Sequence, residues 1–275
     1  MSNRPTTLSH IGIQVEESFS CDFIMRIGEK IYHVESCSST NDIARELILQ
    51  GAEEGTVVIS EAQEKGRGTK GRQWFSIPGK GIYLSVILRP KKSNVSILPL
   101  LAGVAVIDSI LEATGIRVYL KWPNDIVWDG KKLGGILSES CFAGKRLHYV
   151  ILGIGLNVSH LKKDFPEEIR DLATSLRLIS RKSMKKDALL EKILHTLNLW
   201  YDIFLESHAR KMIRAVENCS PFSSGDIIEV ETSRGQETGV YQGIDSHGRL
   251  ILEIQGEKRS FLATEILSPI QKKGE

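Results

Sequence analysis

The alternation of apolar and polar residues along the first two thirds of the chain predicts strands and helices in turn. In residues 30–36 (KIYHVES) apolar and polar residues alternate with a period of two, which is typical of a half-buried strand. The stretch SSTNDIARELILQG then places Ile43, Leu47 and Ile48 on one helical face, with hydroxyls to cap it and Asp42 three positions after Ser39. Short apolar runs predict further strands in GTVVISEAQ, GIYLSVILRP, IRVYLKWPND, GKKLGGILSES and YVILGIGLNVS.

Two longer segments carry apolar residues at helical spacing. SILPLLAGVAVIDSILEATG is strongly apolar and ends at Gly115, which suits a helix C-terminus. KDALLEKILHTLNLWYDIFLESH predicts one long amphipathic helix. Residues 1–28 are weakly patterned, and we expect a loose segment there. This part of the sequence indicates a sheet flanked by helices.

The pattern changes after Pro221, where short alternating runs are separated by Gly, Asp and Ser. About five short strands without a helical period predict a small β-barrel or sandwich. We therefore expect two domains, one over residues 1–219 and a smaller one over residues 220–275.

Composition restricts the class of protein. The 275 residues are 41% hydrophobic and 25% charged, with a formal net charge of +2. Such a balance is ordinary for a globular protein and argues against one that mainly coats nucleic acid. The sequence shows no signal peptide and no apolar run long enough to span a membrane, and its four cysteines are scattered, so we expect a cytoplasmic location.

The segment KGRGTKGRQWFS (residues 65–76) combines glycines with cations. It formally contains G-x-G-x-x-G, but a dinucleotide site requires a helix to begin directly after the loop, and here the sequence continues into a strand. Glycines let backbone N–H groups approach an anion, and Arg67, Lys70 and Arg72 would neutralise it. A solvated basic hairpin is the alternative.

Glycines also recur in two predicted strands. In VILGIGLNVS the period of two places Gly153, Gly155 and Asn157 on one face and apolar residues on the other. Glycine inside a strand often marks the close approach of a ligand or of another backbone, so a flat ligand or a tightly packed helix would explain it. Lys132 precedes Gly134 and Gly135 in a similar strand; an isolated lysine is more often solvent-facing.

The segment KWPND ends another predicted strand with Asn124 and Asp125. A carboxylate at a strand end could hold Mg²⁺ beside a nucleotide. Pro-Asn-Asp is equally good turn chemistry.

Four segments in this order, SSTN, GRGTKGRQW, KWPND…KKLGGIL and GIGLN, resemble the biotin protein ligase family over about residues 30–270. The resemblance implies an α+β fold: a class II aminoacyl-tRNA-synthetase-like biotin–lipoate ligase catalytic domain, in which helices flank a mixed sheet, followed by an SH3-like β-barrel. It implies ATP and biotin as substrates with Mg²⁺, and formation of biotinyl-5'-AMP with release of pyrophosphate. The biotin then passes to a lysine of a biotin carboxyl carrier domain, the expected partner.

The resemblance also implies site residues. Arg67 and Lys132 would be catalytic, Arg67 between the biotin carboxylate and the phosphate and Lys132 at the α-phosphorus. The biotin set is Ser39, Thr40, Asn41, Gln63, Arg67, Lys132, Gly135, Gly153 and Gly155. The nucleotide set is Gly66, Arg67, Gly68, Arg72, Trp74, Asn124 and Asn157, with Asp125 as the metal ligand.

The sequence departs from the family pattern in two places. Thr69 stands where the basic loop often has a second arginine, so we expect weaker retention of the adenylate unless Lys70 compensates. The release rate of free biotinyl-AMP, compared with an arginine-bearing relative, tests this. The residues before the first catalytic strand are too few for the DNA-binding domain of some members, so we expect no DNA binding and no repressor activity. Family members include monomers and dimers, so a homodimer is possible.

Two rival interpretations are compatible with parts of the pattern. A lipoate or octanoate ligase shares the catalytic fold, although the basic loop and the C-terminal β domain favour biotin. A nucleic-acid-binding module would use the basic loop with Trp74 and Phe75 for stacking. A biotin-dependent thermal shift that is insensitive to salt would separate these, because nucleic-acid binding weakens steeply with salt.

Overall fold

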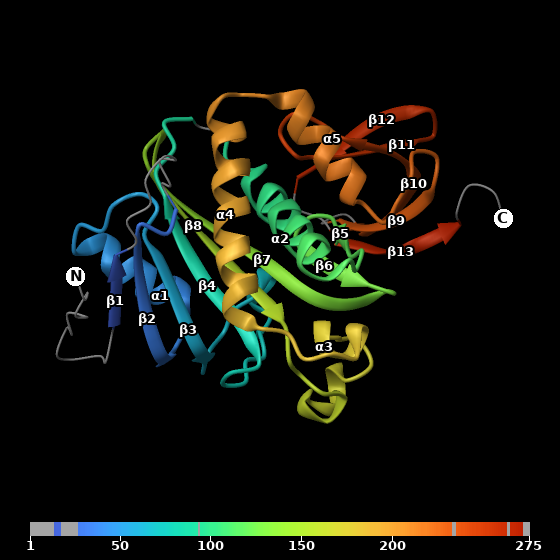
Figure 1. The fold of residues 1–275 in the computed structure, drawn as a ribbon. Coiled ribbons are helices and arrows are strands. Elements are labelled where there is room, and N and C mark those ends of the chain that lie inside the picture. Colours follow the sequence, from blue (N-terminus) through green and yellow to red (C-terminus); the bar gives the residue numbers. More distant parts are fainter. Residues whose placement is uncertain (1–13, 18–26, 93, 233–234, 263–264, 272–275) are drawn as a thin grey trace.

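The computed structural model describes residues 14–17, 27–92, 94–232, 235–262 and 265–271 (Figure 1). The described residues form one eight-stranded sheet, one five-stranded sheet and the helices that pack between and around them. Within them, no helix is both long and apolar enough to cross a membrane.

The eight-stranded sheet is mixed. Its strand order is β1-β2-β3-β4-β8-β7-β6-β5, and the β2–β3 pair is parallel while the other neighbours are antiparallel. The strands are β1 (Gln14–Glu17), β2 (Lys30–Cys37), β3 (Val57–Gln63), β4 (Gly81–Leu88), β5 (Tyr119–Lys121), β6 (Asp125–Trp128), β7 (Lys131–Ala143) and β8 (Arg146–Asn157). The strand segments predicted before Pro221 all pair in this sheet. The predicted strand that ends in KWPND stops earlier, at Lys121, and after a turn Asp125 begins β6, which was not predicted.

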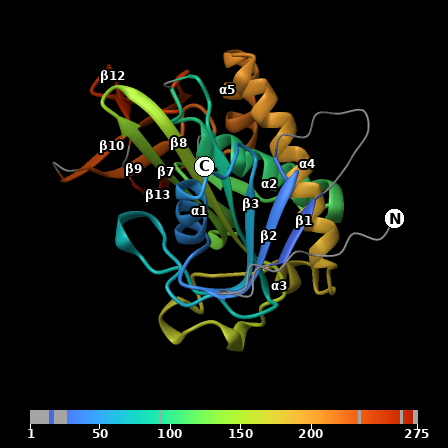
Figure 2. The same ribbon diagram turned by 90° about the vertical axis from the view of Figure 1, so that its left-hand side faces the viewer.

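Helices cover the sheet unequally (Figure 2). One face carries α1 (Thr40–Leu49), whose apolar side packs in a small core cluster with residues of β2, β3, β4 and β8. The other face carries α2 (Leu98–Thr114) and α4 (Lys186–Leu205), with α5 (Ala209–Cys219) beside α2. Shorter elements are η1 (Thr69–Gly71), η2 (Lys162–Asp164), η3 (Glu167–Ile169) and α3 (Leu176–Ser180).

Strand β8 follows the predicted alternation. Leu152, Ile154 and Leu156 are buried in the large core cluster under α2, while Gly153 and Gly155 face the α1 side. The interpretation of one apolar face and one glycine-bearing face is therefore confirmed, and it fixes the face on which a ligand could lie.

The C-terminal sheet has the order β12-β11-β10-β9-β13, with antiparallel pairing throughout. Its strands are β9 (Ile227–Thr232), β10 (Gly235–Ile244), β11 (Leu250–Ile254), β12 (Glu257–Phe261) and β13 (Glu265–Gln271), which agrees with the expected small β domain. The Trp122 indole donates a hydrogen bond to the Gly248 carbonyl at 2.9 Å, and buried residues of both sheets join one apolar cluster. The boundary at residue 219 stays a prediction; α5 ends there.

Three local expectations were wrong or incomplete. Residues 14–17 pair with β2 and Ile27 is buried, so this part of 1–28 is not loose, because the edge of β2 supplies the pairing; the rest of that segment, 1–13 and 18–26, lies outside the described residues. Ser39 is the N-cap of α1, but its side chain makes no capping hydrogen bond. Helix α5 was not predicted, although Met212, Ile213 and Val216 follow helical spacing and pack toward the core.

Candidate active site

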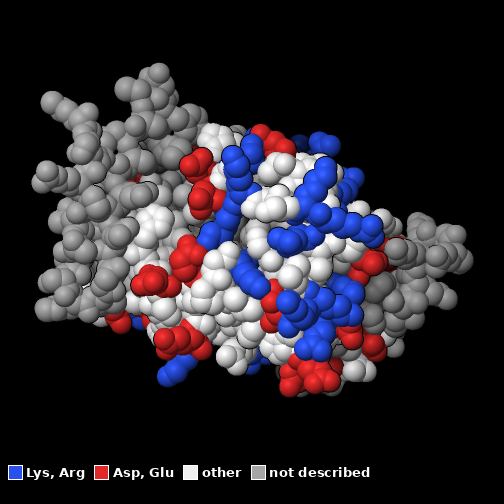
Figure 3. Space-filling view, turned by 60° about the horizontal axis from the view of Figure 1, so that its bottom comes forward, with Lys and Arg blue, Asp and Glu red and all other residues white. Residues whose placement is uncertain are grey.

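A cleft on the α1 face of the sheet brings the predicted ligand-binding residues together. It is lined by all nine residues of the biotin set and by Gly68, Thr69, Trp74, Asn124, Ile136, Leu137 and Ile154. Residues from α1, β3, the β3–β4 loop, β7 and β8 thus meet at one place. Figure 3 looks onto the end of the molecule where the β3–β4 loop lies, and there Lys and Arg side chains gather over the described surface.

The floor of the cleft consists of strand glycines that are covered by side chains of the protein itself. A Cβ on Gly153 would lie 2.5 Å from Asn41 Oδ1, and one on Gly155 would lie 2.6 Å from the Trp74 ring. A Cβ on Gly135 would approach Lys132 and Trp74 at 3.3 Å and 3.4 Å. The flat group that rests on the bare backbone is therefore the Trp74 indole, and the free volume is only about 40 Å³.

The glycine-rich loop folds as a tight hairpin over this floor. The Trp74 amide donates to the Gly66 carbonyl at 2.8 Å, and the Gly68 amide donates to the Arg72 carbonyl at 2.7 Å. Lys70 and Gly71 adopt positive φ angles of 57° and 72° at the tip. Gly66 is required by close approach, because a Cβ there would lie 2.7 Å from the Trp74 carbonyl oxygen. The hairpin places Arg67 and Trp74 over the cleft.

Arg67 is held by two carboxylates. Its guanidinium donates to both oxygens of Asp42, at 2.8 Å and 2.7 Å, and lies 3.7 Å from Glu139. The hydrogen bonds from Arg67 are the largest cause that lowers the pKa of Asp42 to about 2, and the same pair raises the pKa of Arg67. A bidentate pair of this kind fixes the guanidinium in the cleft until another anion replaces the carboxylate.

A chain of polar side chains runs under the cleft. Gln63 Oε1 accepts hydrogen bonds from the Thr40 amide at 2.8 Å and from its hydroxyl at 3.1 Å. The buried Ser85 hydroxyl lies 2.7 Å from Thr40 Oγ1 and 2.6 Å from Asn41 Oδ1, and Asn41 Nδ2 donates to Glu139 at 2.6 Å. Because each buried polar group has a partner, the network fixes these side chains in position.

Lys132 reaches the cleft from β7. Its ammonium is 2.6 Å from Asp125 Oδ1 and 5.8 Å from the centre of the Trp74 ring. Its main chain is tied to the segment after β8, since its amide donates to the Leu172 carbonyl at 2.8 Å. The cleft therefore holds two cations, each paired with a carboxylate of the protein.

The donor set at Asp125 fits a metal ion that arrives with a nucleotide. The described residues contain no cluster of three His, Cys, Asp or Glu side chains that could hold a metal by themselves. Mg²⁺ usually keeps several waters and binds one or two carboxylates together with substrate phosphates. A single carboxylate beside Asn124 suits that arrangement.

The predicted nucleotide set is only partly assembled in the cleft. Arg67, Gly68, Trp74 and Asn124 line it, and Asn124 Nδ2 donates to the Ile136 carbonyl at 2.8 Å. Three residues of this set, and the predicted metal ligand, do not line the cleft: Gly66, Arg72, Asn157 and Asp125. Asn157 is buried and donates to the Thr174 carbonyl at 3.0 Å, which ties the end of β8 to the following loop.

Three residues of the site were not singled out from the sequence. The sequence pattern points to Asp42 only as a helix-capping residue, and the residues predicted from it do not include Glu139 or Ser85; in the structure Asp42 binds Arg67, and Glu139 and Ser85 bind Asn41. A signal was available for Ser85, since it is a hydroxyl within the apolar strand GIYLSVIL and lies opposite Gly153 in the register. Glu139 lies in a strand that ends at the surface, where a carboxylate is unremarkable, so its role needed the fold.

Similar proteins are known by sequence and by structure. Residues 33–157 match the model of the biotin/lipoate A/B protein ligase family. The bifunctional ligase/repressor BirA of Bacillus spizizenii is 37% identical over 240 residues, which is 86% of this chain and 74% of that protein. The biotin–[acetyl-CoA-carboxylase] ligase of Mycobacterium tuberculosis is 33% identical over 231 residues, 81% of this chain and 83% of that one.

Among solved structures, the biotin protein ligase of Aquifex aeolicus in complex with biotin and ATP superposes with a TM-score of 0.75. It is 30% identical and covers 86% of this chain and 97% of its own. The fold expected from the resemblance is thereby confirmed. With relatives at this identity and coverage, the chain belongs to the biotin/lipoate A/B protein ligase family, as a homologue of the biotin–protein ligases.

Proposed function

We propose that this protein is an ATP-dependent biotin protein ligase that uses MgATP to form biotinyl-5'-AMP and then biotinylates a carrier domain. The observation that carries the proposal is the meeting of Arg67 and Lys132 with the whole predicted biotin set in one cleft. The relatives named as biotin–[acetyl-CoA-carboxylase] ligases support the same reaction and a carboxylase carrier domain as the acceptor.

The first step joins two anions, which explains the need for two cations. A carboxylate oxygen of biotin attacks the α-phosphorus of ATP, the bond from that phosphorus to the bridging oxygen breaks, and pyrophosphate leaves. Arg67 would leave Asp42 to bridge the biotin carboxylate and the phosphate, while Lys132 stabilises charge at the α-phosphorus. Mg²⁺, held partly by Asp125, would neutralise phosphate charge when the nucleotide binds.

The polar chain under the cleft would orient biotin. The ureido ring of biotin offers one carbonyl acceptor and two N–H donors, and Ser39, Thr40, Asn41 and Gln63 supply matching groups. Hydrogen bonds among Thr40, Asn41, Gln63 and Ser85 hold these side chains in place before the substrate arrives, so little ordering is needed on binding.

Trp74 must move before both substrates fit. The free volume of about 40 Å³ is far below that of an ordinary ligand pocket, and the indole lies on Gly155 where a flat ligand would lie. Its buried Nε1 has no hydrogen-bond partner, so the ring gives up no such bond when it leaves the floor. We infer that it then becomes a wall for the adenine.

The second step transfers biotin to the carrier. A neutral lysine amine of the carrier domain attacks the carbonyl carbon of biotinyl-5'-AMP, AMP leaves with the electrons of the C–O bond, and the amine loses a proton. The glycine-rich hairpin would exclude water from the mixed anhydride until the acceptor arrives.

The reaction is tested with biotin-dependent exchange between ATP and pyrophosphate, which reports the first step without a carrier. We expect exchange with biotin and none with lipoate. Transfer is then followed by mass spectrometry of a carrier domain, in which one lysine should gain biotin. Exchange with lipoate alone would instead assign the cleft to lipoate activation.

A further inference from the structure

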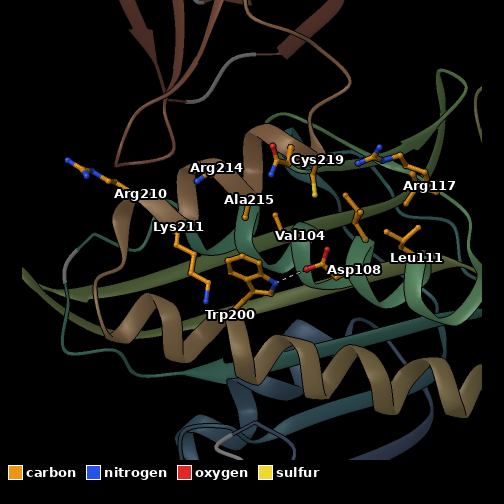
Figure 4. A pocket seen from close by; sticks show the side chains of 13 residues that line it. Val104, Asp108, Leu111, Arg117, Trp200, Arg210, Lys211, Arg214, Ala215 and Cys219 are labelled. Atoms are coloured by element: carbon orange, nitrogen blue, oxygen red, sulfur yellow. Dashed lines mark hydrogen bonds between the residues drawn. The ribbon is translucent and has the colours of Figure 1, made fainter.

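A second and much larger cavity lies behind the eight-stranded sheet (Figure 4). It has a volume of about 520 Å³, within the range of small-molecule sites, and it is bounded by α2, α4, α5 and the segment that precedes β5. None of its lining residues lines the cleft described above, because α2, α4 and α5 cover the opposite face of the sheet. We call this cavity the rear pocket.

The walls of the rear pocket are apolar. Val104, Ile107 and Leu111 of α2, Ala215 of α5 and Trp200 of α4 contribute aliphatic and aromatic surface. The Trp200 ring projects from α4 toward Ala215, and the Cys219 sulfur points into the same space (Figure 4). Burial, as the largest cause, raises the pKa of the Cys219 thiol to about 12, which agrees with its apolar surroundings.

The rim of the rear pocket is cationic. Arg117, Arg210, Lys211 and Arg214 all lie on it, and across the described residues none of the four forms an ion pair with a carboxylate. Arg117 and Lys211 lie on opposite sides of the cavity, whereas Arg210 points away from it (Figure 4). Unpaired cations around an apolar hollow favour an anionic occupant.

The rear pocket contains one carboxylate, that of Asp108, and this carboxylate already has a hydrogen-bond partner. Asp108 Oδ2 accepts a hydrogen bond from the Trp200 indole at 3.0 Å. Burial, the largest cause, raises the pKa of Asp108, so the pocket disfavours its charge. Four cations against one carboxylate leave an excess of three positive charges around the pocket.

We propose that the rear pocket binds a small amphipathic anion, whose apolar body packs on Trp200 and α2 and whose carboxylate or phosphate is attracted to the cationic rim by the combined charge of Arg117, Lys211 and Arg214. Because α5 leads directly into the C-terminal sheet and α2 packs against β7, such a ligand would bridge the two sheets from behind. The site needs no contact with biotin or ATP, so it does not depend on the proposed function.

The first test uses 1-anilinonaphthalene-8-sulfonate as the anion and N-phenyl-1-naphthylamine as its uncharged counterpart. We expect the intact chain to bind one sulfonate molecule more tightly than the neutral compound, and the difference to shrink as salt rises from about 0.05 M to about 0.5 M. Saturating biotin with MgATP should leave the signal unchanged, because the cleft is on the other face. Equal binding of the two compounds would overturn the proposal.

Variants locate the site. The double variant R117Q/K211Q should weaken binding of the sulfonate by about tenfold and leave the neutral compound unchanged. R210Q is the matched control, since that side chain lines the rim but points away, and it should change binding by less than about twofold. Unchanged sulfonate binding by the double variant would refute the assignment.

A filling variant tests the apolar wall. A215W should place a ring in the cavity and abolish binding of both compounds, with circular dichroism to show that the fold is kept. If A215W fails to fold, the charge variants decide alone, because their side chains are exposed and their loss leaves the core intact. Displacement of the sulfonate by octanoate or by phenyl phosphate then tells whether the natural head group is a carboxylate or a phosphate.

Discussion

The two faces of the eight-stranded sheet hold cavities of opposite character. The α1 face carries a cleft with about 40 Å³ of free space, in which Arg67 and Lys132 are paired with Asp42 and Asp125. The other face carries the rear pocket of about 520 Å³, whose cations have no carboxylate partners among the described residues.

The comparison shows that the larger of two cavities need not be the active site. A site that must bring two anions together needs strong cations, and without substrates those cations are held by carboxylates of the protein and the space is filled by an indole. In the part of the chain that the structure describes, no carboxylate forms an ion pair with the cations of the rear pocket, and Asp108 accepts a hydrogen bond from Trp200 instead.

The largest expected effect is on catalysis. Lys132→Gln or Arg67→Gln should lower biotin-dependent pyrophosphate exchange by about 10²–10³-fold, because each removes a cation from the reacting phosphate. Lys131→Gln is the matched control on the same strand and should stay within about twofold. Arg117→Gln on the rear face should also leave exchange unchanged. Wild-type rates in Lys132→Gln would remove that residue from the mechanism.

The next effect comes from the floor of the cleft. Gly153→Ala would place a Cβ 2.5 Å from Asn41 Oδ1, so the amide must move and its bonds to Ser85 and Glu139 weaken. We expect a loss of about 1–3 kcal/mol in the free energy of unfolding, measured with urea, together with weaker biotin binding. Adding Asn41→Ala should cancel the clash, so the double variant is no less stable than Asn41→Ala alone. Additive losses would contradict this account.

A smaller effect is expected from Asp42 on the pH dependence of the free energy of unfolding. Its pKa is about 2 in the folded chain against 3.8 as the ordinary value, so its contribution to stability is present above pH 3.8 and is lost as pH falls toward 2. Since the carboxylate is partly exposed, we expect at most about 2 kcal/mol. Asp42→Asn should flatten the fall in unfolding free energy over that interval.

His160 titrates at higher pH than Asp42, so the effects of the two groups on the free energy of unfolding can be separated. Burial lowers the pKa of His160 from 6.5 to about 4, so the stability that the neutral ring contributes is lost as pH falls from 6.5 to 4. His160→Gln should therefore change the upper window and leave the lower one to Asp42. A difference for Asp42→Asn confined to pH 4–6.5 would show that another group is responsible.

The smallest effect lies on the rear face. Trp200→Phe removes the hydrogen bond to Asp108 and should cost about 0.5–1.5 kcal/mol of unfolding free energy. The pKa of Asp108, followed by nuclear magnetic resonance, should rise further, because burial remains and a bond that favours the charged form is gone. Pyrophosphate exchange should not change. A loss of exchange in this variant would show that the two faces are coupled.

Most secondary structure could be predicted because it depends on local periodicity. The alternation in β8 identified its core face, and the apolar helix before Gly115 ends there with φ at 72°. Strand β1 could not be predicted in the same way, because it exists through its pairing with β2. Helix α5 was missed although Met212, Ile213, Val216 and Cys219 follow helical spacing, so a local signal for it was present.

The order of four short motifs determined the family and most of the residues that line the cleft, because residue type and spacing are written in the chain. Only the tertiary structure decided what each residue contacts. Asp42 and Glu139 hold Arg67, Trp74 covers Gly155, and Asn41 covers Gly153, each through contacts between segments distant in sequence. The rear pocket likewise exists only because three helices and the segment before β5 meet, and no local pattern encodes such a meeting.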